Sequence, residues 1–259
     1  MPNCCSSRCC DVNDYTLHWL LNRRPGAFEA VLARSFGGEH TPYQWLGRAV
    51  SATAKRVLVL ACGSGAMVEE VVRDGRLVVG VDWSASAIEV AQRRDRRELV
   101  QGDVNYLPFG PATFDAVVSD MGLAVNENRM LMLSEVARVL RPGGMFAALT
   151  PSMRPLNFDD AKEMSSLVRI LRRFPHVPGQ TEFRAVRLLR YAGLQKAEDA
   201  RAKFYFTVRN RSDAELLLAG LRATDDAARA HAAVEHLADR ARREEIRVPL
   251  PFRRILALN

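Results

Sequence analysis

Two glycines and a carboxylate are spaced in a way that suits the binding of a ribose-bearing ligand. Gly63 and Gly65 follow a short apolar run at 57–61, and Asp82 ends a second apolar run at 77–81. Glycine lets the backbone turn sharply and lets a ligand approach the main chain without a Cβ in the way. A carboxylate at the tip of the next strand is placed to accept hydrogen bonds from the two hydroxyls of a ribose.

Two further carboxylates end apolar stretches later in the chain, Asp103 after 99–102 and Asp120 after 114–119. Ligands of open parallel sheets bind beyond the carboxyl ends of the strands, so these side chains are expected at one edge together with Asp82. A dinucleotide-binding turn would favour a third glycine where Val68 stands. The glycine turn and the acid alone are therefore compatible with any nucleotide, although the dinucleotide-binding pattern is incomplete.

The elements that must position these side chains alternate regularly. Apolar runs predict strands at 57–61, 77–82, 99–103, 114–120 and 145–149. Apolar residues at helical spacing predict helices between these strands at 66–73, 84–91 and 130–140. Ser84 is a good N-cap for the second helix, and residues 141–144 end the third. This alternation predicts an open parallel sheet with helices on both faces.

The segment before the first strand is expected to be helical and to fold over the ligand edge as a cap, the alternative being an extra packing layer. Its apolar stripes are Val12, Tyr15 and Trp19, then Phe28, Val31, Leu32 and Phe36, then Tyr43, Trp45 and Leu46. We expect residues 1–52 to form this tail and cap, and residues 53–259 to form the main domain.

The last third of the chain adds helices to the alternation. Helices are predicted at 159–173, at 183–191, from a Ser212/Glu215 capping box, and from residue 224 to 241, with strands at 202–208 and 246–258. The helical insertions around 151–180 and 212–245 are expected to form a lid over the ligand edge of the sheet.

Charge and composition bound the partners. The net charge of +7 lies wholly in residues 151–259, but the arginines there alternate with acids, which is typical of a solvated helix surface. Basic residues are not interleaved with aromatics, so nucleic acid is not the expected partner. No apolar stretch approaches the ~20 residues of a membrane span and the N-terminus lacks an apolar signal core, so we expect a cytoplasmic protein.

The five cysteines do not predict a metal site. Four of them crowd into Cys4, Cys5, Cys9 and Cys10, without the Cys-x2-Cys spacing of ordinary zinc sites or a second ligand cluster. Cys62, inside the glycine turn, is expected to be a small packing residue.

The chain resembles the class I S-adenosylmethionine-dependent methyltransferases, in the ubiquinone/menaquinone-biosynthesis-type (methyltransferase type 11-like) branch. The matching pieces, in order and at family spacing, are Val57 to Gly65, Val79 to Asp82, Gln101 to Asp103 with Leu107 to Phe109, Phe114 to Ser119, and Glu135 to Gly144. They cover roughly residues 55–150, with weaker support at 247–252. The resemblance implies a Rossmann-like, mostly parallel, seven-stranded α/β sheet.

The resemblance also implies roles for individual residues toward S-adenosylmethionine. The expected cofactor-binding residues are Gly63, Ser64 and Gly65 at the methionine moiety, Asp82 at the ribose hydroxyls, Trp83 and Asp103 at the adenine, the Val104 amide at the adenine ring, and the Ser119 main chain near the methionine amine. The sequence departs from the family at Val59, where an acid is common, and at Ala61, where glycine is common.

A methyl transferase needs a base only if the acceptor must lose a proton. Asp120, at the sheet edge, is the first candidate for this role and His18, in the cap, the second. The expected function is methyl transfer to O, N or C of a small-molecule metabolite. An RNA or protein methyltransferase and a non-catalytic cofactor-binding protein stay open as alternatives, and so does the oligomeric state, with a homodimer as one option.

Overall fold

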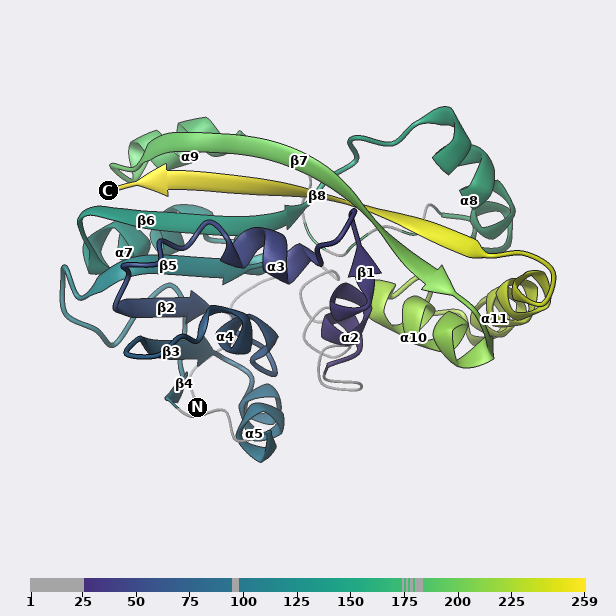
Figure 1. Ribbon diagram of the computed structural model, residues 1–259, viewed down its shortest axis with the longest axis horizontal. Coiled ribbons are helices and arrows are strands. Elements are labelled where there is room, and N and C mark those ends of the chain that lie inside the picture. The colour runs from purple at the N-terminus through teal and green to yellow at the C-terminus, as the bar shows by residue number, and fades with distance from the viewer. Residues whose placement is uncertain (1–25, 95–97, 174, 176, 178, 180–183) are drawn as a thin grey trace, which may run out of the picture.

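The computed structural model describes residues 26–94, 98–173, 175, 177, 179 and 184–259 (Figure 1). His18, the four N-terminal cysteines and the first apolar stripe of the expected cap lie outside these residues. Among the described residues, no helix has the length and apolar character needed to span a membrane.

The centre of the molecule is one sheet with the strand order β1-β7-β8-β6-β5-β2-β3-β4. Neighbouring strands from β6 to β4 run parallel, and β8, β7 and β1 join them in antiparallel fashion. The strand bounds are β1 Ser35–Phe36, β2 Arg56–Leu60, β3 Leu77–Asp82, β4 Leu99–Gln101, β5 Phe114–Asp120, β6 Leu140–Pro151, β7 Gln195–Val208 and β8 Ile246–Leu258.

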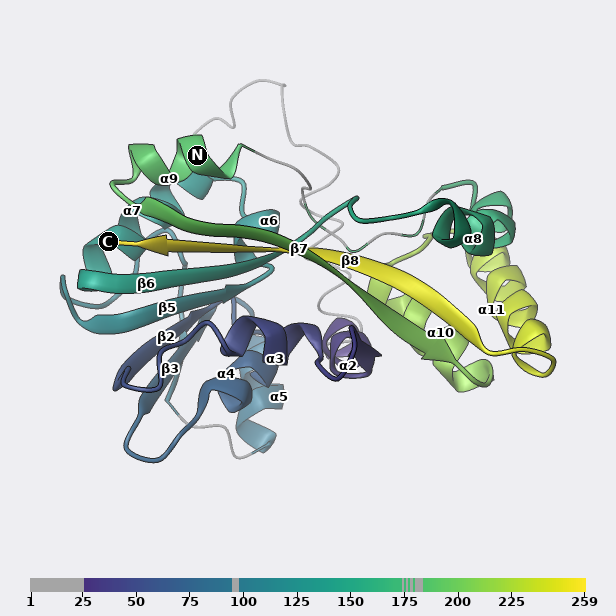
Figure 2. The same cartoon turned by 45° about the horizontal axis from the view of Figure 1, so that its top comes forward.

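Both faces of the parallel part are buried, which explains its continuous apolar strands. Along β2, Val57 and Val59 belong to one apolar cluster, and Leu58 and Leu60 belong to the other. Figure 2 shows that helices cover both sides of the sheet. One face carries α3 Pro42–Gly47, α4 Ala66–Val71 and α5 Ala85–Arg93; the other carries α6 Gly122–Val125, α7 Arg129–Val139 and α9 Ala185–Tyr191.

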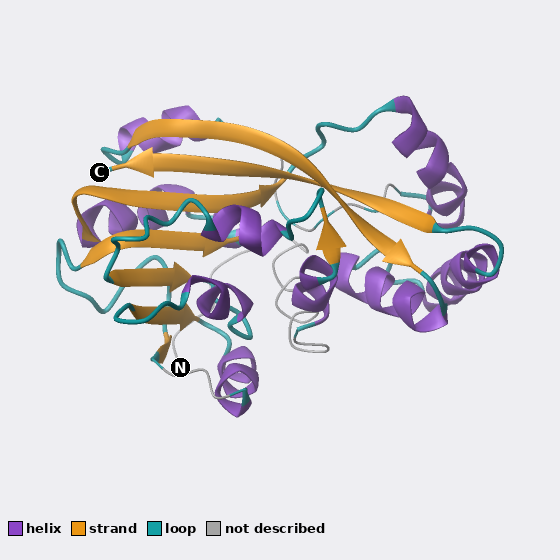
Figure 3. Cartoon of the chain, viewed as in Figure 1, coloured by secondary structure: helices purple, strands orange, loops and turns teal. Residues whose placement is uncertain are grey.

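The two longest strands continue past the parallel sheet and form what we call the arm. Strand β8 pairs with β6 only as far as Phe252, whereas its pairing with β7 continues to Ile246. Three helices pack on this two-stranded extension and complete the arm, which projects from the sheet in Figures 1 and 3. They are α8 Phe158–Leu171, α10 Arg211–Leu221 and α11 Ala227–Ala241.

A short N-terminal helix, α2 Ala27–Ala33, connects the arm with the sheet edge. It packs closely on α10, where a Cβ on Gly220 would collide with Val31. The Arg34 guanidinium adds an ion pair with Asp213 of α10. The α2 position is therefore fixed by the arm, while its first turn reaches the glycine turn after β2, as described below.

The structure corrects several details of the sequence-based expectation. Within the described residues the sheet has eight strands rather than seven, because Ser35–Phe36 pairs with β7 as a short strand. Phe36 therefore does not continue the helical stripe of α2, and it is 48% exposed. Strand β7 starts at Gln195, seven residues earlier than predicted, and β6 already starts at Leu140.

The N-terminus of α10 is also different. The predicted Ser212/Glu215 capping box is wrong, since Asn210 is the N-cap and its side chain accepts a hydrogen bond from the Asp213 amide. Asn210 starts the helix two residues earlier, and Asn is as good an N-cap as Ser. Elsewhere Ser84 caps α5 as predicted.

Candidate cofactor site at the carboxyl edge of the sheet

The glycine turn links β2 to α4 and needs a left-handed backbone. Gly63 has φ 53° and Gly65, the N-cap of α4, has φ 87°. Only glycine adopts such conformations at no steric cost. Gly63 is also a close-approach position, since a Cβ there would collide with the Glu29 carboxylate.

Asp82 ties the glycine turn to the end of β3. Its Oδ2 accepts a hydrogen bond from the Gly63 amide at 2.8 Å, and its Oδ1 accepts one from the Ser84 amide at 2.9 Å. Burial raises the pKa of Asp82, and these two amides act in the opposite direction. The turn and the carboxylate therefore form one rigid unit, in which each carboxylate oxygen keeps a lone pair for a further donor.

The other residues predicted around the adenine follow the ends of β3 and β4. Trp83 directly follows Asp82 and is 40% exposed, so its indole offers an apolar face to a ligand. The main-chain oxygen of Trp83 accepts a hydrogen bond from Gln101 at 3.2 Å. Asp103 is exposed, Oδ1 of its side chain accepts a hydrogen bond from Asn105, and Val104 is half-buried beside it.

Ser119 and Asp120 end β5, next to the turn that follows β2. Leu60 pairs with Ser119, so Ala61 and Asp120 come next along two adjacent strands. Ser119 is fully buried, and its hydroxyl accepts a hydrogen bond from the Leu123 amide. The predicted sheet-edge residues are therefore brought together, whereas His18 lies outside the described residues.

The Asp120 carboxyl is the most perturbed titratable group of the site. Burial, followed by the negative charge of Glu29, raises its pKa to about 7, while the Tyr43 hydroxyl acts to lower it. A carboxyl with a pKa near neutrality can take up a proton at physiological pH and release it again. Its chemistry and its place at the strand end both fit the predicted role of a base.

Glu29 is a site residue that sequence reasoning missed. Its Oε1 accepts a hydrogen bond from the Ser64 amide at 2.6 Å, and its Oε2 pairs with the Ser64 hydroxyl. Arg94, which follows α5, also reaches Ser64 by donating to the hydroxyl at 2.9 Å. The only local signal was an acid in the first turn of a predicted helix, and nothing in the sequence connects that turn with residue 64.

The two departures from the family pattern have clear structural settings. Val59 is fully buried in the apolar cluster beneath α3 and α4, so this position offers the site no carboxylate. Ala61 has φ 53°, a conformation that is costly for a residue with a Cβ. Its methyl group faces Gly122, where a Cβ would lie only 2.8 Å away, so Gly122 leaves the room that Ala61 needs.

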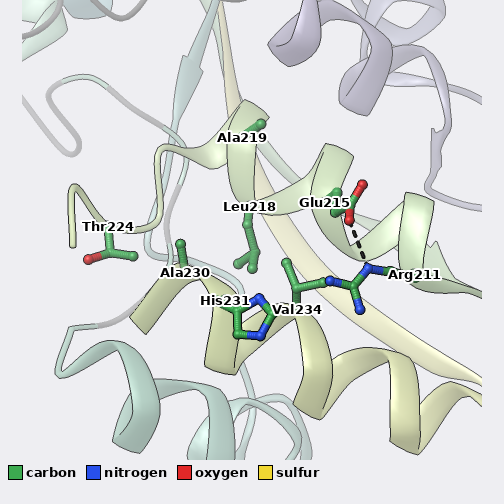
Figure 4. A pocket seen from close by; sticks show the side chains of 8 residues that line it. All are labelled: Arg211, Glu215, Leu218, Ala219, Thr224, Ala230, His231 and Val234. Atoms are coloured by element: carbon green, nitrogen blue, oxygen red, sulfur yellow. Dashed lines mark hydrogen bonds and ion pairs between the residues drawn. The ribbon is translucent and has the colours of Figure 1, made fainter. Parts of the chain in front are cut away.

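A cavity of about 500 Å³ lies beside the glycine turn, between α2, α3 and α4. Its lining includes Glu29, Tyr43 and Arg94. A smaller cavity of about 310 Å³ lies on the arm between α10 and α11 (Figure 4). There the Arg211 guanidinium is paired with Glu215 and Glu235, so the charge of that lining is already compensated.

Comparison with known proteins places the middle of the chain in a family. Residues 58–148 match the family model described as "Methyltransferase domain". A demethylmenaquinone methyltransferase of Clavibacter sepedonicus is 38% identical over 114 residues, which is 42% of this chain and 46% of that protein. A fatty-acid O-methyltransferase of Mycolicibacterium smegmatis is 39% identical over 97 residues, which is 36% and 35% of the two chains. The chain thus spans less than half the length of these curated relatives.

Solved structures confirm the fold over a larger part of the chain. The 4+2 cyclase SpnF covers 94% of this chain and 94% of its own, with a TM-score of 0.60 and 17% identity. The YcgJ protein of Bacillus subtilis covers 84% of this chain and 97% of its own, with a TM-score of 0.54 and 18% identity.

The fold, the turn and the matched segment define a class I S-adenosylmethionine-dependent methyltransferase domain. Residues 58–148 match the methyltransferase domain model, and the similarity to a demethylmenaquinone methyltransferase supports the menaquinone-type branch of this class. S-adenosylmethionine is the cofactor of this class, and it supplies an activated methyl group. The backbone of the glycine turn, the Asp82 carboxylate and the exposed Trp83 indole are of the kinds that suit its methionine, ribose and adenine parts, in that order.

Among the described residues, no group of His, Cys, Asp and Glu side chains could hold a metal ion.

Proposed function

We propose that the protein transfers a methyl group from S-adenosylmethionine to O, N or C of a small-molecule metabolite. The observation that carries this proposal is the hydrogen bond between the Gly63 amide and Asp82, inside the matched segment. It joins the close-approach face of the turn to a buried carboxylate at the position that suits ribose hydroxyls. Trp83, Asp103 and Val104 then receive the adenine, and Ser64, Gly65 and the Ser119 main chain the methionine part.

Methyl transfer is an in-line displacement, so the chain must hold the acceptor close to the methyl group and exclude water. Asp120 supplies the base where the acceptor must lose a proton, because its pKa of about 7 lets it accept one at neutral pH. His18 is the second candidate for this role.

The acceptor class follows from the relatives and from the arm. The curated relatives are named for demethylmenaquinone and for fatty acids. We propose an acceptor of comparable size that is held between the sheet edge and the helical elements. In this scheme, residues 1–52 form a cap, the insertions around 151–180 and 212–245 form a lid, and 53–259 is the domain that carries them.

A cytoplasmic location without membrane partners accompanies this proposal. Nucleic acid is a poor candidate partner, because many arginines of the basic last third are engaged in ion pairs. Arg229 pairs with Asp226, and Arg240 pairs with Glu163 and Glu244. Such pairs reduce the positive potential that a phosphate backbone would need. A homodimer remains one of the assemblies to be tested.

The test is calorimetric titration of the protein with S-adenosylmethionine, followed by detection of S-adenosylhomocysteine in the presence of small apolar acceptors. We expect binding and acceptor-dependent turnover. Absence of binding, with the protein folded by circular dichroism, would disprove the proposal.

A non-catalytic cofactor-binding protein is the second candidate, and the left-handed Ala61 together with the apolar Val59 favours it. It predicts binding without turnover. Formation of S-adenosylhomocysteine with any acceptor decides against it, since turnover requires transfer of the methyl group.

A further inference from the structure

Two side chains of opposite charge meet at Ser64, and the proposed function uses neither of them. The Glu29 carboxylate accepts a hydrogen bond from the Ser64 amide at 2.6 Å, while the Arg94 guanidinium donates one to the Ser64 hydroxyl at 2.9 Å. The Glu29 Oε2 and Arg94 Nη1 atoms are 3.8 Å apart. A carboxylate and a guanidinium therefore stand side by side on the glycine turn.

Different elements hold these two charges in place. Glu29 lies in the first turn of α2, which is fixed against α10, and its side chain is only 15% exposed. Arg94 follows α5 on the other side of the turn, and its side chain is 49% exposed. The pair thus combines a mostly buried anion with a more accessible cation.

Glu29 also lies where a ligand would contact Gly63. Its Oε1 occupies the space that a Cβ of Gly63 would fill, so a group bound against that face of the turn meets the Glu29 carboxylate. Asp82 already accepts the amides of Gly63 and Ser84 at the other side of the turn. Of these two carboxylates, Glu29 is the one on the side of Gly63 where a Cβ would project.

We propose that Glu29 and Arg94 bind the amino-acid end of the cofactor, with Glu29 pairing with its ammonium group and Arg94 with its carboxylate. This inference rests on the proposed function. It names residues that bind the charged amino-acid end of the cofactor rather than its nucleoside. In the free protein the two side chains pair with each other across Ser64. The cofactor replaces this internal pair with two external ones of the same charges.

The charge balance supports this assignment. A buried ammonium group needs a carboxylate partner, because transfer of an unpaired charge from water into the protein is costly. Val59 is apolar, so that strand supplies none. Arginine binds carboxylates with a fork of parallel donors, which suits the other end of the zwitterion.

A second consequence concerns Asp120. The Glu29 charge is one reason why the pKa of Asp120 is raised, and the Tyr43 hydroxyl from α3 is the other polar side chain that acts on it. An ammonium group on Glu29 compensates this charge. The bound cofactor is therefore expected to lower the pKa of Asp120 and to keep a larger fraction of this carboxyl ionised at neutral pH.

The test compares three ligands in calorimetric titrations: S-adenosylhomocysteine, its deaminated analogue and its decarboxylated analogue. The variants are Glu29→Gln and Arg94→Gln, with Glu70→Gln as the control. Glu70 lines the same cavity from α4, and it has no hydrogen bond or ion pair to Ser64. Because every ratio compares ligands within one variant, a moderate loss of protein stability does not change the outcome.

We expect Glu29→Gln to weaken S-adenosylhomocysteine binding roughly tenfold or more, as for the loss of a charged hydrogen bond, and to leave the deaminated analogue unaffected. Arg94→Gln should weaken S-adenosylhomocysteine but not the decarboxylated analogue. Glu70→Gln should change none of the three.

Two results would overturn the proposal. Tighter binding by Glu29→Gln would show that Glu29 blocks the turn, and equal weakening of all three ligands would show a structural role only. Both results leave cofactor binding by the wild type intact. A wild-type protein that binds none of the three ligands would instead refute the proposed function, and this inference with it.

Discussion

The parallel sheet and the arm differ in how their residues are used. In the parallel sheet, the described contacts of Gly63, Asp82 and Ser119 join strand ends to turns, so polar groups converge on one edge. In the arm, apolar side chains of β7, β8 and their helices fill a core, and charged side chains pair on its surface. The parallel sheet gathers its polar groups at one edge, whereas the arm distributes its charged side chains over its surface.

This difference separates two tasks. A cofactor that is the same in every methyltransferase of the class is read by fixed backbone turns and strand ends, which short motifs can encode. An acceptor that differs from one enzyme to another would be read by helices whose only constraint is to bury an apolar face. On this view, substitutions in the arm should change stability and acceptor choice, and substitutions at the sheet edge should change cofactor affinity.

The largest expected effect tests the arm as a packing unit. Leu237 of α11 is 2% exposed, so Leu237→Ala should lower the free energy of unfolding by about 2–5 kcal/mol through lost burial and a residual cavity. Affinity for S-adenosylhomocysteine should stay within about twofold, measured by calorimetry below the melting temperature. A parallel fall in cofactor affinity would break the separation of the two regions.

The second prediction concerns the sheet edge. Asp82→Ala should weaken cofactor binding roughly tenfold or more, since the carboxylate accepts a hydrogen bond from the Gly63 amide and is proposed to accept the ribose hydroxyls as well. Asp103→Ala is the milder comparison, because Asp103 is exposed and holds only the Asn105 amide in the described structure. Calorimetric affinity of Asp82→Ala equal to wild type would remove the site from this edge.

The third prediction follows from the raised pKa of Asp120, about 7 against 3.8 for a free Asp. The carboxyl of the unfolded chain ionises first, so the contribution of Asp120 to wild-type stability should fall as pH rises from about 4 to about 7 and stay level above. Asp120→Asn lacks this titration and should be more stable than wild type at pH 8, with the gain vanishing near pH 4. Thermal melts across this range measure the effect.

Asp115, at the other end of β5, provides a control of opposite sign. Its pKa is lowered by the Arg56 and Lys55 amides and by Arg141, against the effect of burial. Its contribution to stability is present above the unfolded pKa and is lost as pH falls through the native pKa, so Asp115→Asn should destabilise the protein at neutral pH but not in strong acid. Equal slopes for the two variants would contradict both assignments.

The smallest expected effect is a gain at the glycine turn. Ala61→Gly should raise the free energy of unfolding by about 1 kcal/mol, because glycine adopts φ 53° without the penalty of a Cβ. Ala87→Gly, inside α5, should instead lower it by about 0.5–1 kcal/mol. Denaturant titrations of both variants check the signs.

Much of the fold could be predicted because its signals are local. The bounds of β3, β5 and β8 agree with the sequence prediction, since apolar residues dominate each of these strands. The early part of β7 was missed because Lys196, Glu198 and Asp199 interrupt its pattern. Their place in the sheet depends on pairing with β8, including the Asp199–Arg253 ion pair, and a pairing partner is not visible in a single segment.

The candidate site was predictable where its residues lie at the ends of predicted strands. Strand-end residues such as Asp82 and Asp120 follow from the rule that ligands lie beyond the carboxyl ends of parallel strands. Glu29 does not, because it reaches Ser64 only through the packing of α2 on α10. The proposed roles of Trp83, Asp103 and Val104 remain predictions for a ligand-bound structure.

The length of β8 has a consequence for how the molecule opens. Between Phe252 and Leu258 this strand has neighbouring strands on both sides, whereas from Ile246 to Leu250 it is paired with β7 alone. Amide hydrogens of one continuous strand should therefore exchange with deuterium at two rates, fast toward Ile246 and slow toward Leu258. The boundary near Phe252 would then act as a hinge, at which backbone hydrogen bonds of the arm open transiently while those of the parallel sheet stay formed.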